Sequence, residues 1–334
     1  MKLLFKLFVL ILMASDLALA RQASTDLPRL TGPYLGQNPP GMTAELFAPG
    51  IISLGYHEHR IAISPDGSEI YFPVFGNEVV AAKIMFTRLE NGKWSTPCVA
   101  PFSDKGLNLH PSFSPDGNQL YFTSTRPVDE NNTKKNRADI WFVKRIGNSW
   151  SQPIHMGDEV NTSYHESCPT IMADGTLFFE STRNEMKNLD IYFSVLKDGV
   201  RQNAEKLGSP VNTEYGEGSP FVAPDASYML FSSNRPGTLG EHDIYVTFKD
   251  KSGGWGEPVN LGSKINSVYY DWTPIVTPDG NYLFFSSYRN TDPIVPVDSI
   301  YSEKLKKEIG SPKTGNGTFY WVSAKIIEEL KPKE

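Results

Sequence analysis

Short hydrophobic runs and polar turns recur five times between residues 58 and 301, with the same order of residue types in each copy. Each turn ends in Asp-Gly or Asp-Ala, and four of the five carry a proline before the aspartate. The turns occupy residues 64–67, 114–117, 173–175, 223–226 and 277–280, and their aspartates are 50, 58, 51 and 54 residues apart. Proline at the first turn position and glycine at a later one favour a tight hairpin between two strands.

Aromatic-rich segments of strand composition surround these turns. The strand after each turn is predicted at residues 69–72, 119–122, 177–179, 228–231 and 282–285. A third strand is predicted at 138–141, 189–192, 242–245 and 298–301, and a fourth at 94–97, 150–153 and 255–258. Four strands in a period of this length predict an all-β fold, a β-propeller with four-stranded antiparallel blades and five repeats.

Both ends of the repeat region carry a further candidate strand. Residues 44–47 resemble a fourth strand with no blade before it, and residues 318–324 resemble one last strand. One of these two segments must close the ring. We expect a single propeller domain over residues 44–328, a Pro/Gly-rich lead at 21–43 and a polar tail at 329–334.

The first twenty residues differ in character from the repeats. Lys2 and Lys6 precede an apolar run at 7–13, and Ala18-Leu19-Ala20 follows, a pattern typical of a signal peptide cleaved after Ala20. The mature protein is therefore expected to be periplasmic or secreted. No other stretch approaches the roughly 20 apolar residues that a transmembrane helix needs.

Charge and cysteine content narrow the range of partners. Losing Lys2, Lys6 and Asp16 with the signal peptide changes the formal charge from −6 to −7, and the remaining charges are dispersed. Nucleic-acid binding, which needs a basic stripe, is not expected. We expect a monomer. The two cysteines, Cys98 and Cys168, are too few to define the fold, and whether they pair stays open.

The repeat resembles that of a known family. Ser-Pro-Asp-Gly, an aromatic strand, Ser-x-Arg and Asp-Ile-Tyr are similar to the TolB-type, WD-like propeller repeats of exported bacterial proteins. The resemblance covers nearly all of the mature chain and implies a propeller, usually of six blades, whereas five copies are visible. Five or six blades therefore both remain open. The same repeat serves adaptor proteins, peptidase propellers and polysaccharide lyases, so it implies no single function.

Polar residues recur at or just before the start of the predicted first strand of each repeat. If the first strands line the channel, these residues form a ring around one mouth, where a cation, a sugar or a peptide terminus could bind. Because they recur, we favour a structural role, with the arginines bonded to neighbouring carboxylates. The ring residues are Glu58, Asn108, Glu166, Glu217 and Asp271, with Arg126, Arg183, Arg235 and Arg289 at the ends of the second strands.

Histidines depart from the repeat and gather in the same loops. His57 and His59 flank Glu58, His110 precedes a proline, and His165 precedes Glu166. Such groups are candidate ligands for a divalent metal ion, or an acid and a base, with hydrogen-bonded surface histidines as the alternative. At this level the histidines resemble those of propeller-type oligogalacturonate lyases, in which histidines on the propeller face hold a metal. Their motif does not match residue by residue, so no catalytic residue is carried over.

Two further residues have no repeated counterpart. Arg60 and Trp272 lie in the same region and are better ligand candidates than the repeated tyrosines of the approach loops. The candidate ligand-binding residues are His57, Glu58, His59, Arg60, His110, His165, Glu166, Glu217, Asp271 and Trp272, and the candidate metal ligands are His57, His59, His110 and His165.

Familiar catalytic motifs are missing from the sequence. It contains no Gly-x-Ser-x-Gly elbow, no His-Glu-x-x-His pair, no phosphate loop and no dinucleotide fingerprint. We therefore expect an exported, non-enzymatic propeller that binds a protein, peptide or glycan at the channel mouth. The alternative is a glycan-active enzyme, a polysaccharide lyase or hydrolase, with a His/Glu site on the same face and a divalent metal ion as its candidate cofactor.

Overall fold

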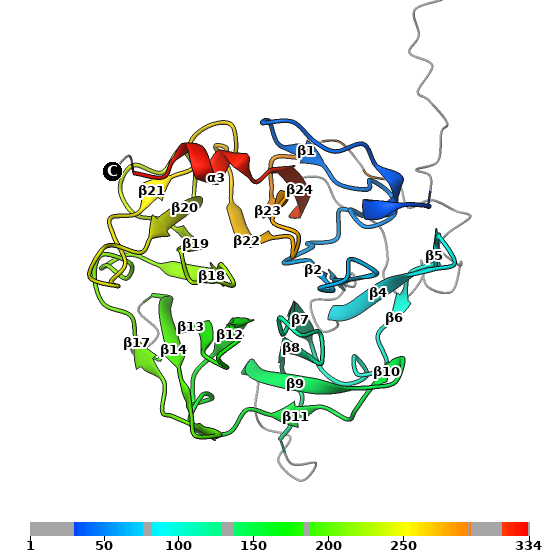
Figure 1. Cartoon of the computed structure of the whole chain (residues 1–334), viewed down its shortest axis with the longest axis horizontal. Coiled ribbons are helices and arrows are strands. Elements are labelled where there is room, and N and C mark those ends of the chain that lie inside the picture. The colour runs from blue at the N-terminus through cyan, green and yellow to red at the C-terminus, as the bar shows by residue number, and fades with distance from the viewer. Residues whose placement is uncertain are drawn as a thin grey trace, which may run out of the picture.

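Five small antiparallel sheets surround a central axis (Figure 1). The computed structural model describes residues 30–75, 82–128, 137–183, 188–290, 292, 294 and 316–332. The sheets form a five-bladed β-propeller, so the predicted all-β fold is confirmed and the ring closes with five blades rather than six. No helix in the described part of the chain is long and apolar enough to cross a membrane.

The inner two strands of each blade are those predicted around the turns. The innermost strands are β2 (Ala62–Ile63), β7 (Asn108–Phe113), β12 (Glu166–Ile171), β18 (Glu217–Val222) and β22 (Asp271–Val276). Their partners are β3 (Glu69–Phe75), β8 (Gln119–Ser124), β13 (Leu177–Ser181), β19 (Tyr228–Ser233) and β23 (Tyr282–Ser287). In the first turn, Asp66 accepts hydrogen bonds from the Ser64 hydroxyl and the Ser68 amide, and Gly67 has a φ of 71°. The turn chemistry predicted from sequence therefore connects these strands.

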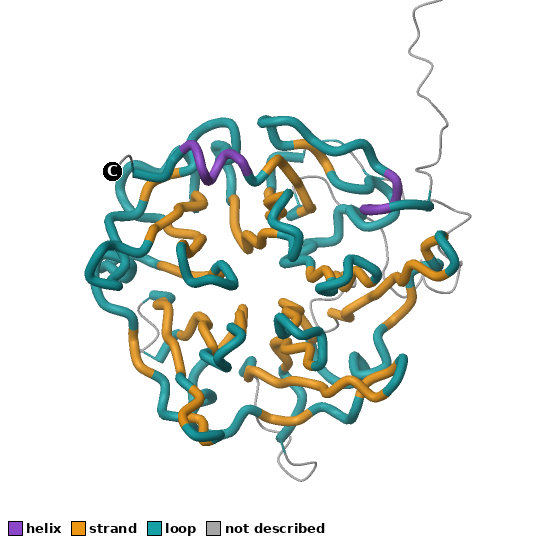
Figure 2. Tube along the Cα trace, in the orientation of Figure 1, coloured by secondary structure: helices purple, strands orange, loops and turns teal. Residues whose placement is uncertain are grey.

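The outer strands complete each blade. The third strands are β4 (Ala82–Glu90), β9 (Asp139–Ile146), β14 (Asp190–Ser194), β20 (Asp243–Phe248) and β24 (Thr318–Ser323). The outermost strands are β5 (Lys93–Trp94), β6 (Cys98–Val99), β10 (Ser149–Trp150), β11 (Ile154–His155), β17 (Glu205–Lys206), β21 (Val259–Asn260) and β1 (Glu45–Leu46). A small hairpin of β15 (Leu196–Lys197) and β16 (Val200–Arg201) forms a separate sheet. The two helical segments, purple in Figure 2, are the 3-10 turn η1 (Pro33–Gly36) and the helix α3 (Lys325–Glu329).

Two details of the outer strands differ from the prediction. The fourth strands lie elsewhere than expected: of 94–97 and 150–153 only Trp94 and Trp150 are in strands, and β6 and β11 begin directly after Pro97 and Pro153, which have no amide hydrogen to donate. Likewise β21 begins directly after the expected 255–258. The third strand of the fifth blade is β24, at the far end of the chain, rather than residues 298–301. Those residues lie outside the described part of the chain.

The two ends of the repeat region close the ring together. Strand β1 pairs antiparallel with β24, with Glu45 opposite Trp321 and Leu46 opposite Tyr320. The N-terminal segment therefore supplies the outermost strand of a blade whose other three strands come from the C-terminal region. The fourth strand predicted at residues 44–47 is therefore the outermost strand of the fifth blade.

Aromatic side chains fill the space between neighbouring blades. Phe72, Phe122, Phe179, Phe231 and Phe285 occupy the same position in the second strand of each blade, and all are at most 1% exposed. Burial of each ring contributes roughly 1.5–3 kcal/mol to folding. Both cysteines are free, Cys98 exposed in β6 and Cys168 buried in β12, so they do not pair.

Candidate functional site

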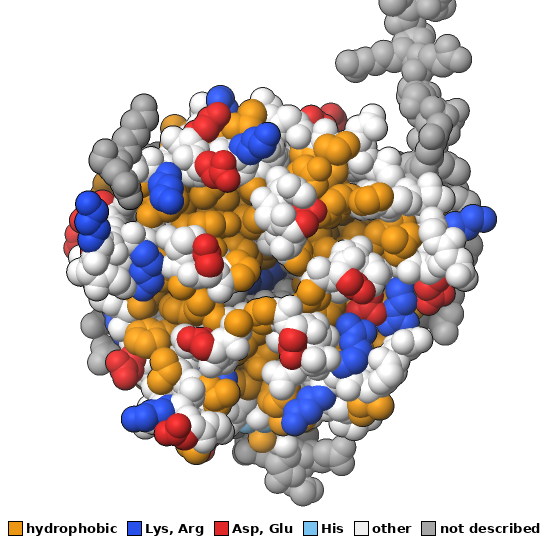
Figure 3. All heavy atoms as spheres, in the orientation of Figure 1, with side chains coloured by type: hydrophobic (Ala, Val, Ile, Leu, Met, Phe, Trp, Pro, Cys, Tyr) orange, Lys and Arg blue, Asp and Glu red, His pale blue; other side chains and the backbone are white. Residues whose placement is uncertain are grey.

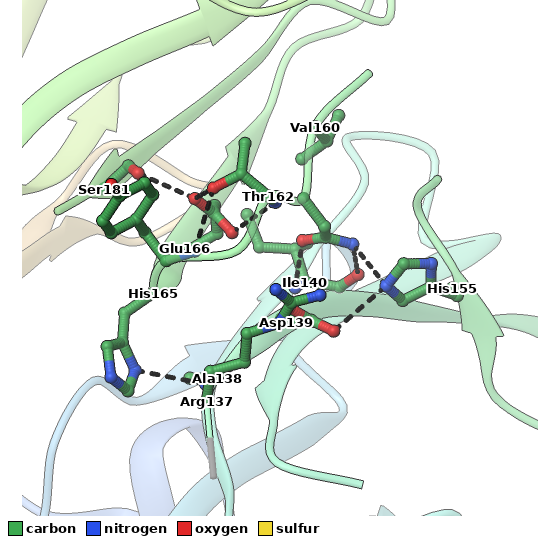
Figure 4. Close-up of polar contacts among 12 residues, drawn as sticks. Arg137, Ala138, Asp139, Ile140, His155, Val160, Thr162, His165, Glu166 and Ser181 are labelled. Atoms are coloured by element: carbon green, nitrogen blue, oxygen red, sulfur yellow. Dashed lines mark hydrogen bonds and ion pairs between the residues drawn. The ribbon is translucent and has the colours of Figure 1, made fainter. Parts of the chain in front are cut away.

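The predicted ring residues lie at the start of the inner strands, or just before it for Glu58, and all five are fully buried. Glu166 accepts hydrogen bonds from the Thr162 amide (2.8 Å), the Thr162 hydroxyl (2.7 Å) and the Ser181 hydroxyl (2.8 Å) (Figure 4). Glu217 and Asp271 make the equivalent bonds to the loops that enter their blades. These oxygens therefore hold loops in place.

The four predicted arginines join each blade to the loop that arrives from the preceding blade. Arg235 donates to the backbone oxygen of Val211 (2.6 Å) and lies 3.3 Å from Glu217, and its guanidinium packs over the Phe231 ring. Arg126, Arg183 and Arg289 make the same kind of contacts to the oxygens of Phe102, Val160 and Ile265. This geometry fits the structural role favoured from the repeat.

The first blade lacks such an arginine and holds Glu58 differently. Its carboxylate accepts hydrogen bonds from the amides of Leu54 (3.0 Å), Gly55 (3.2 Å) and Tyr56 (2.8 Å). Burial raises the pKa of Glu58 to about 7, although the three amides act in the opposite direction. Glu58 is therefore enclosed by its own loop rather than presented at the surface.

Each inner strand, or the segment leading into it, contains one residue with a left-handed backbone, two positions after the ring residue. We call these five residues the bulge ring, and four of them sit where the strand register shifts. They are Arg60, His110, Cys168, Ser219 and Thr273, with φ between 51° and 56°. The repeat spacing contains this position, but sequence alone gave no sign that Cys168, Ser219 and Thr273 belong with the other two.

The bulge ring joins different blades through polar contacts. The Arg60 amide donates to the Thr273 hydroxyl (3.1 Å), and the Cys168 sulfur lies 3.6 Å from the Ser219 hydroxyl. Burial raises the pKa of the Cys168 thiol well above its usual value. The thiol is therefore protonated at neutral pH and unsuited to act as a nucleophile.

Arg60 is not at the mouth, where the sequence suggested a ligand contact. It is 1% exposed, and its guanidinium reaches across the propeller axis from the first blade to the third and fourth. There it donates to the Pro220 oxygen (3.1 Å) and to the Thr170 hydroxyl. The left-handed conformation of Arg60 turns the side chain inward, which the spacing of residues did not predict.

Next to the bulge ring, and sharing His110 with it, histidine and aromatic rings from three blades meet. We call His57, His59, Phe75, His110, Trp272 and Tyr288 the mouth cluster. The His59 ring lies 4.5 Å from the Trp272 ring, 5.3 Å from Phe75 and 6.0 Å from His110, in a nearly parallel arrangement with the last. His57 Nδ1 is 3.2 Å from the Tyr288 hydroxyl. The structure thus brings together three of the four predicted histidines and Trp272.

The imidazoles of His59 and His110 are neutral at physiological pH. Burial, followed by the neighbouring His57, lowers the pKa of His59 to about 3. Burial, His59 and Arg60 together hold the pKa of His110 well below its usual range. The buried His59 Nε2 and Trp272 Nε1 have no hydrogen-bond partner among the described residues, which costs about 1–3 kcal/mol for each unsatisfied group.

His165, the fourth predicted histidine, precedes the third blade and makes its contact with the second. Its Nδ1 accepts a hydrogen bond from the Ala138 amide (3.2 Å), beside the Asp139 and His155 pair (Figure 4). Within the described ranges, no group of three or more His, Cys, Asp or Glu side chains is arranged to hold a metal ion.

The chain is similar to known proteins in its fold alone. No protein-family model matches the sequence, and no curated protein matches it. Putative TolB from Agrobacterium tumefaciens is 20% identical over 69% of this chain and 70% of its own, with a TM-score of 0.46. TolB from Acinetobacter baumannii is 16% identical over 80% and 57%, with a TM-score of 0.48. A glycoside hydrolase is 10% identical over 84% and 89%, with a TM-score of 0.52. At these identities the chain is similar in fold to TolB-like and other β-propellers.

Proposed function

We propose that this chain is an exported, non-enzymatic β-propeller that binds a glycan at the mouth cluster. The observation that carries the proposal is the group of half-buried rings around His59 and Trp272, whose buried Nε2 and Nε1 atoms lack partners among the described residues. Aromatic faces stack on the C–H faces of sugar rings, and neutral ring nitrogens exchange hydrogen bonds with hydroxyls. A neutral sugar ligand therefore suits this cluster better than an ion does.

The cluster is also the place where the blades differ from one another. His59 and Trp272 occupy the position that Leu109, Ser167 and Gly218 occupy in the other blades. Residues that serve the contacts between repeats tend to recur, whereas these two do not. Their difference from the repeat supports a role in recognition rather than in construction.

Export rests on the sequence of residues 1–20, which lie outside the described part of the chain. The repeated Ser-Pro-Asp-Gly turn and Asp-Ile-Tyr strand support a place among the TolB-type exported repeat proteins. N-terminal sequencing of the protein from culture fractions checks this part of the proposal. We expect the mature chain to begin at Arg21 and to occur in the periplasm or the medium.

Among the residues that the structure describes, the ring carboxylates do not favour the glycan-cleaving alternative. Hydrolysis of a glycosidic bond commonly uses two carboxyl groups that flank the bond. Glu58, Glu166, Glu217 and Asp271 are fully buried and bonded to their own loops.

A panel of neutral and acidic polysaccharides tests binding and cleavage together. We expect retention of at least one glycan without release of reducing or unsaturated ends. Release of such ends by the wild type, lost in a folded His110→Ala variant, would contradict the non-enzymatic proposal. Binding of peptides but of no glycan on the panel would contradict the choice of ligand.

A further inference from the structure

The other end of the propeller axis, where the Asp-Gly turns lie, contains a cavity of about 390 Å³. We call it the turn-end cavity. Its size lies within the range of about 300–1,000 Å³ that is usual for small-molecule sites. Ile63, Ile171, Val222 and Val276 line it, together with prolines of the turns. Figure 3 shows hydrophobic side chains around the central hollow of this molecule.

Arg60 contributes the charged group of this apolar cavity. It lines the cavity while only 1% of it is exposed. Its Nη atoms donate to the oxygens of Cys168 and Pro220 and to the Thr170 hydroxyl, but Nε has no partner among the described residues. The guanidinium is therefore held in place with donor capacity to spare.

No carboxylate in the described part of the chain lies within 4.0 Å of the Arg60 guanidinium. Glu180 acts on Arg60 from a greater distance. The Glu180 oxygens already accept hydrogen bonds from the Ser167 hydroxyl (2.5 Å) and the Ser219 amide (2.7 Å). A buried cation without a close counter-ion is costly, so an arriving anion would be stabilised by Arg60.

We propose that the turn-end cavity binds a monocarboxylate with an apolar body, its carboxylate directed at Arg60. A planar carboxylate matches a guanidinium and forms charge-assisted hydrogen bonds with it. The apolar body of such a ligand fills the part of the cavity lined by isoleucine, valine and proline. One buried positive charge suits one negative charge.

The rim of the cavity selects against ligands with more negative charge. The turn aspartates Asp66, Asp116, Asp174, Asp225 and Asp279 are all exposed. Hydrogen bonds from the Ser114 hydroxyl and the Asn118 amide lower the pKa of Asp116, and Ser227 does the same for Asp225. Ionised carboxylates around the entrance repel polyanions, whereas a single carboxylate on an apolar body experiences less of this repulsion.

Octanoate and octanol, titrated calorimetrically into the full chain, test the charge requirement directly. We expect octanoate to bind about tenfold or more tightly than octanol, because a single charge-assisted pair in a buried site is worth at least that ratio. Octanol binding as tightly as octanoate, or no binding of any carboxylate probe, would overturn the proposal. The peptide N-acetyl-Leu-Leu-Leu with a free or an amidated C-terminus shows whether a lipid-like acid or a peptide terminus fits better.

Two variants locate the site. Arg60→Met should abolish the preference for octanoate over octanol. Because that variant is at risk of misfolding, Val276→Phe, which fills the cavity wall and keeps Arg60, provides a second test. Unchanged octanoate binding by folded Val276→Phe would overturn the proposal. Trp272→Ala should leave octanoate binding unchanged. The proposal for the turn-end cavity is therefore tested separately from the proposal for the glycan site.

Discussion

At the scale of single residues, side chains that recur from blade to blade stabilise the fold, whereas side chains found in one blade alone are the candidates for ligand binding. Glu166 and Glu217 recur from blade to blade, are fully buried, and hold loops. His59 and Trp272 replace smaller or aliphatic residues of the other blades, and they meet at the mouth with ring nitrogens that have no hydrogen-bond partner among the described residues. The proposed binding function therefore rests on the residues that do not recur.

His59 should make the protein less stable in acid. Its pKa is about 3 in the folded chain and about 6.5 when unfolded, so the unfolded state binds more protons between these values. Stability is lost as the pH falls through this window, by up to about 1.4 kcal/mol for each pH unit. His59→Leu, which copies Leu109 of the second blade, should flatten the difference in unfolding free energy between pH 6.5 and pH 4.5.

Glu58 acts in the opposite direction in the same region, because its raised pKa of about 7 favours folding as the pH falls from 7 towards 4.5. It is present in both proteins, so the comparison of His59→Leu with the wild type isolates the histidine. Parallel pH profiles for the two proteins would show that His59 is not buried as described.

Gly218 leaves the space that the Glu180 carboxylate occupies. A Cβ atom at Gly218 would lie 2.5 Å from Glu180 Oε2, and Glu180 is held by Ser167 and Ser219. Gly218→Ala should therefore lower the free energy of unfolding by about 1–3 kcal/mol in a denaturant titration. Gly208→Ala is the matched control, because nothing lies within 4 Å of its added Cβ. Equal stability of the two variants would refute this account of Glu180.

At the scale of elements, the left-handed residue of each inner strand explains why the position of Arg60 could not be predicted from the sequence. Turn residues and aromatic runs predicted the hairpins. Alignment of the repeats placed the histidines of the mouth cluster in equivalent loops. The sequence carried no sign of the left-handed residue in each inner strand. A left-handed residue redirects its side chain. For this reason the Arg60 side chain is buried near the propeller axis rather than presented at the mouth. His165 follows the repeat spacing, and its ring bonds to the Ala138 amide of the second blade rather than joining the mouth cluster.

The ring arginines should contribute to stability through the contact between consecutive blades. Arg235→Ala removes the bond to the Val211 oxygen and leaves the buried Glu217 carboxylate without its cation. We expect a loss of about 3 kcal/mol in unfolding free energy, since breaking a buried pair exposes the cost of the remaining charge. Lys197→Ala, at an exposed position of β15, should change little. An Arg235→Ala variant as stable as this control would contradict the structural role.

At the scale of the whole molecule, closure of the ring couples the two ends of the described chain. Phe47 follows β1, is fully buried, and packs at 4.8 Å from the Phe284 ring and 5.1 Å from the Trp321 ring. Its amide also donates to the Phe319 oxygen (2.9 Å). The N-terminal strand therefore belongs to the core of the fifth blade.

Phe47→Ala should destabilise the entire propeller. We expect a loss of about 3–5 kcal/mol, as for other fully buried phenylalanines, within one cooperative transition in chemical denaturation. Phe248→Ala, at a half-buried position of β20, should cost less. If Phe47→Ala costs no more than Phe248→Ala, β1 does not close the ring as described.

The most direct test of the proposed function is calorimetric titration of the tightest glycan of the panel into three proteins: the wild type, Trp272→Ala and Trp255→Ala. Trp272 belongs to the mouth cluster, whereas Trp255 packs against Lys249 at the edge of the fourth blade. We predict that Trp272→Ala weakens binding about tenfold or more, as expected for loss of a stacking ring, while Trp255→Ala binds like the wild type. Unchanged affinity in a folded Trp272→Ala variant would contradict glycan binding at the mouth cluster.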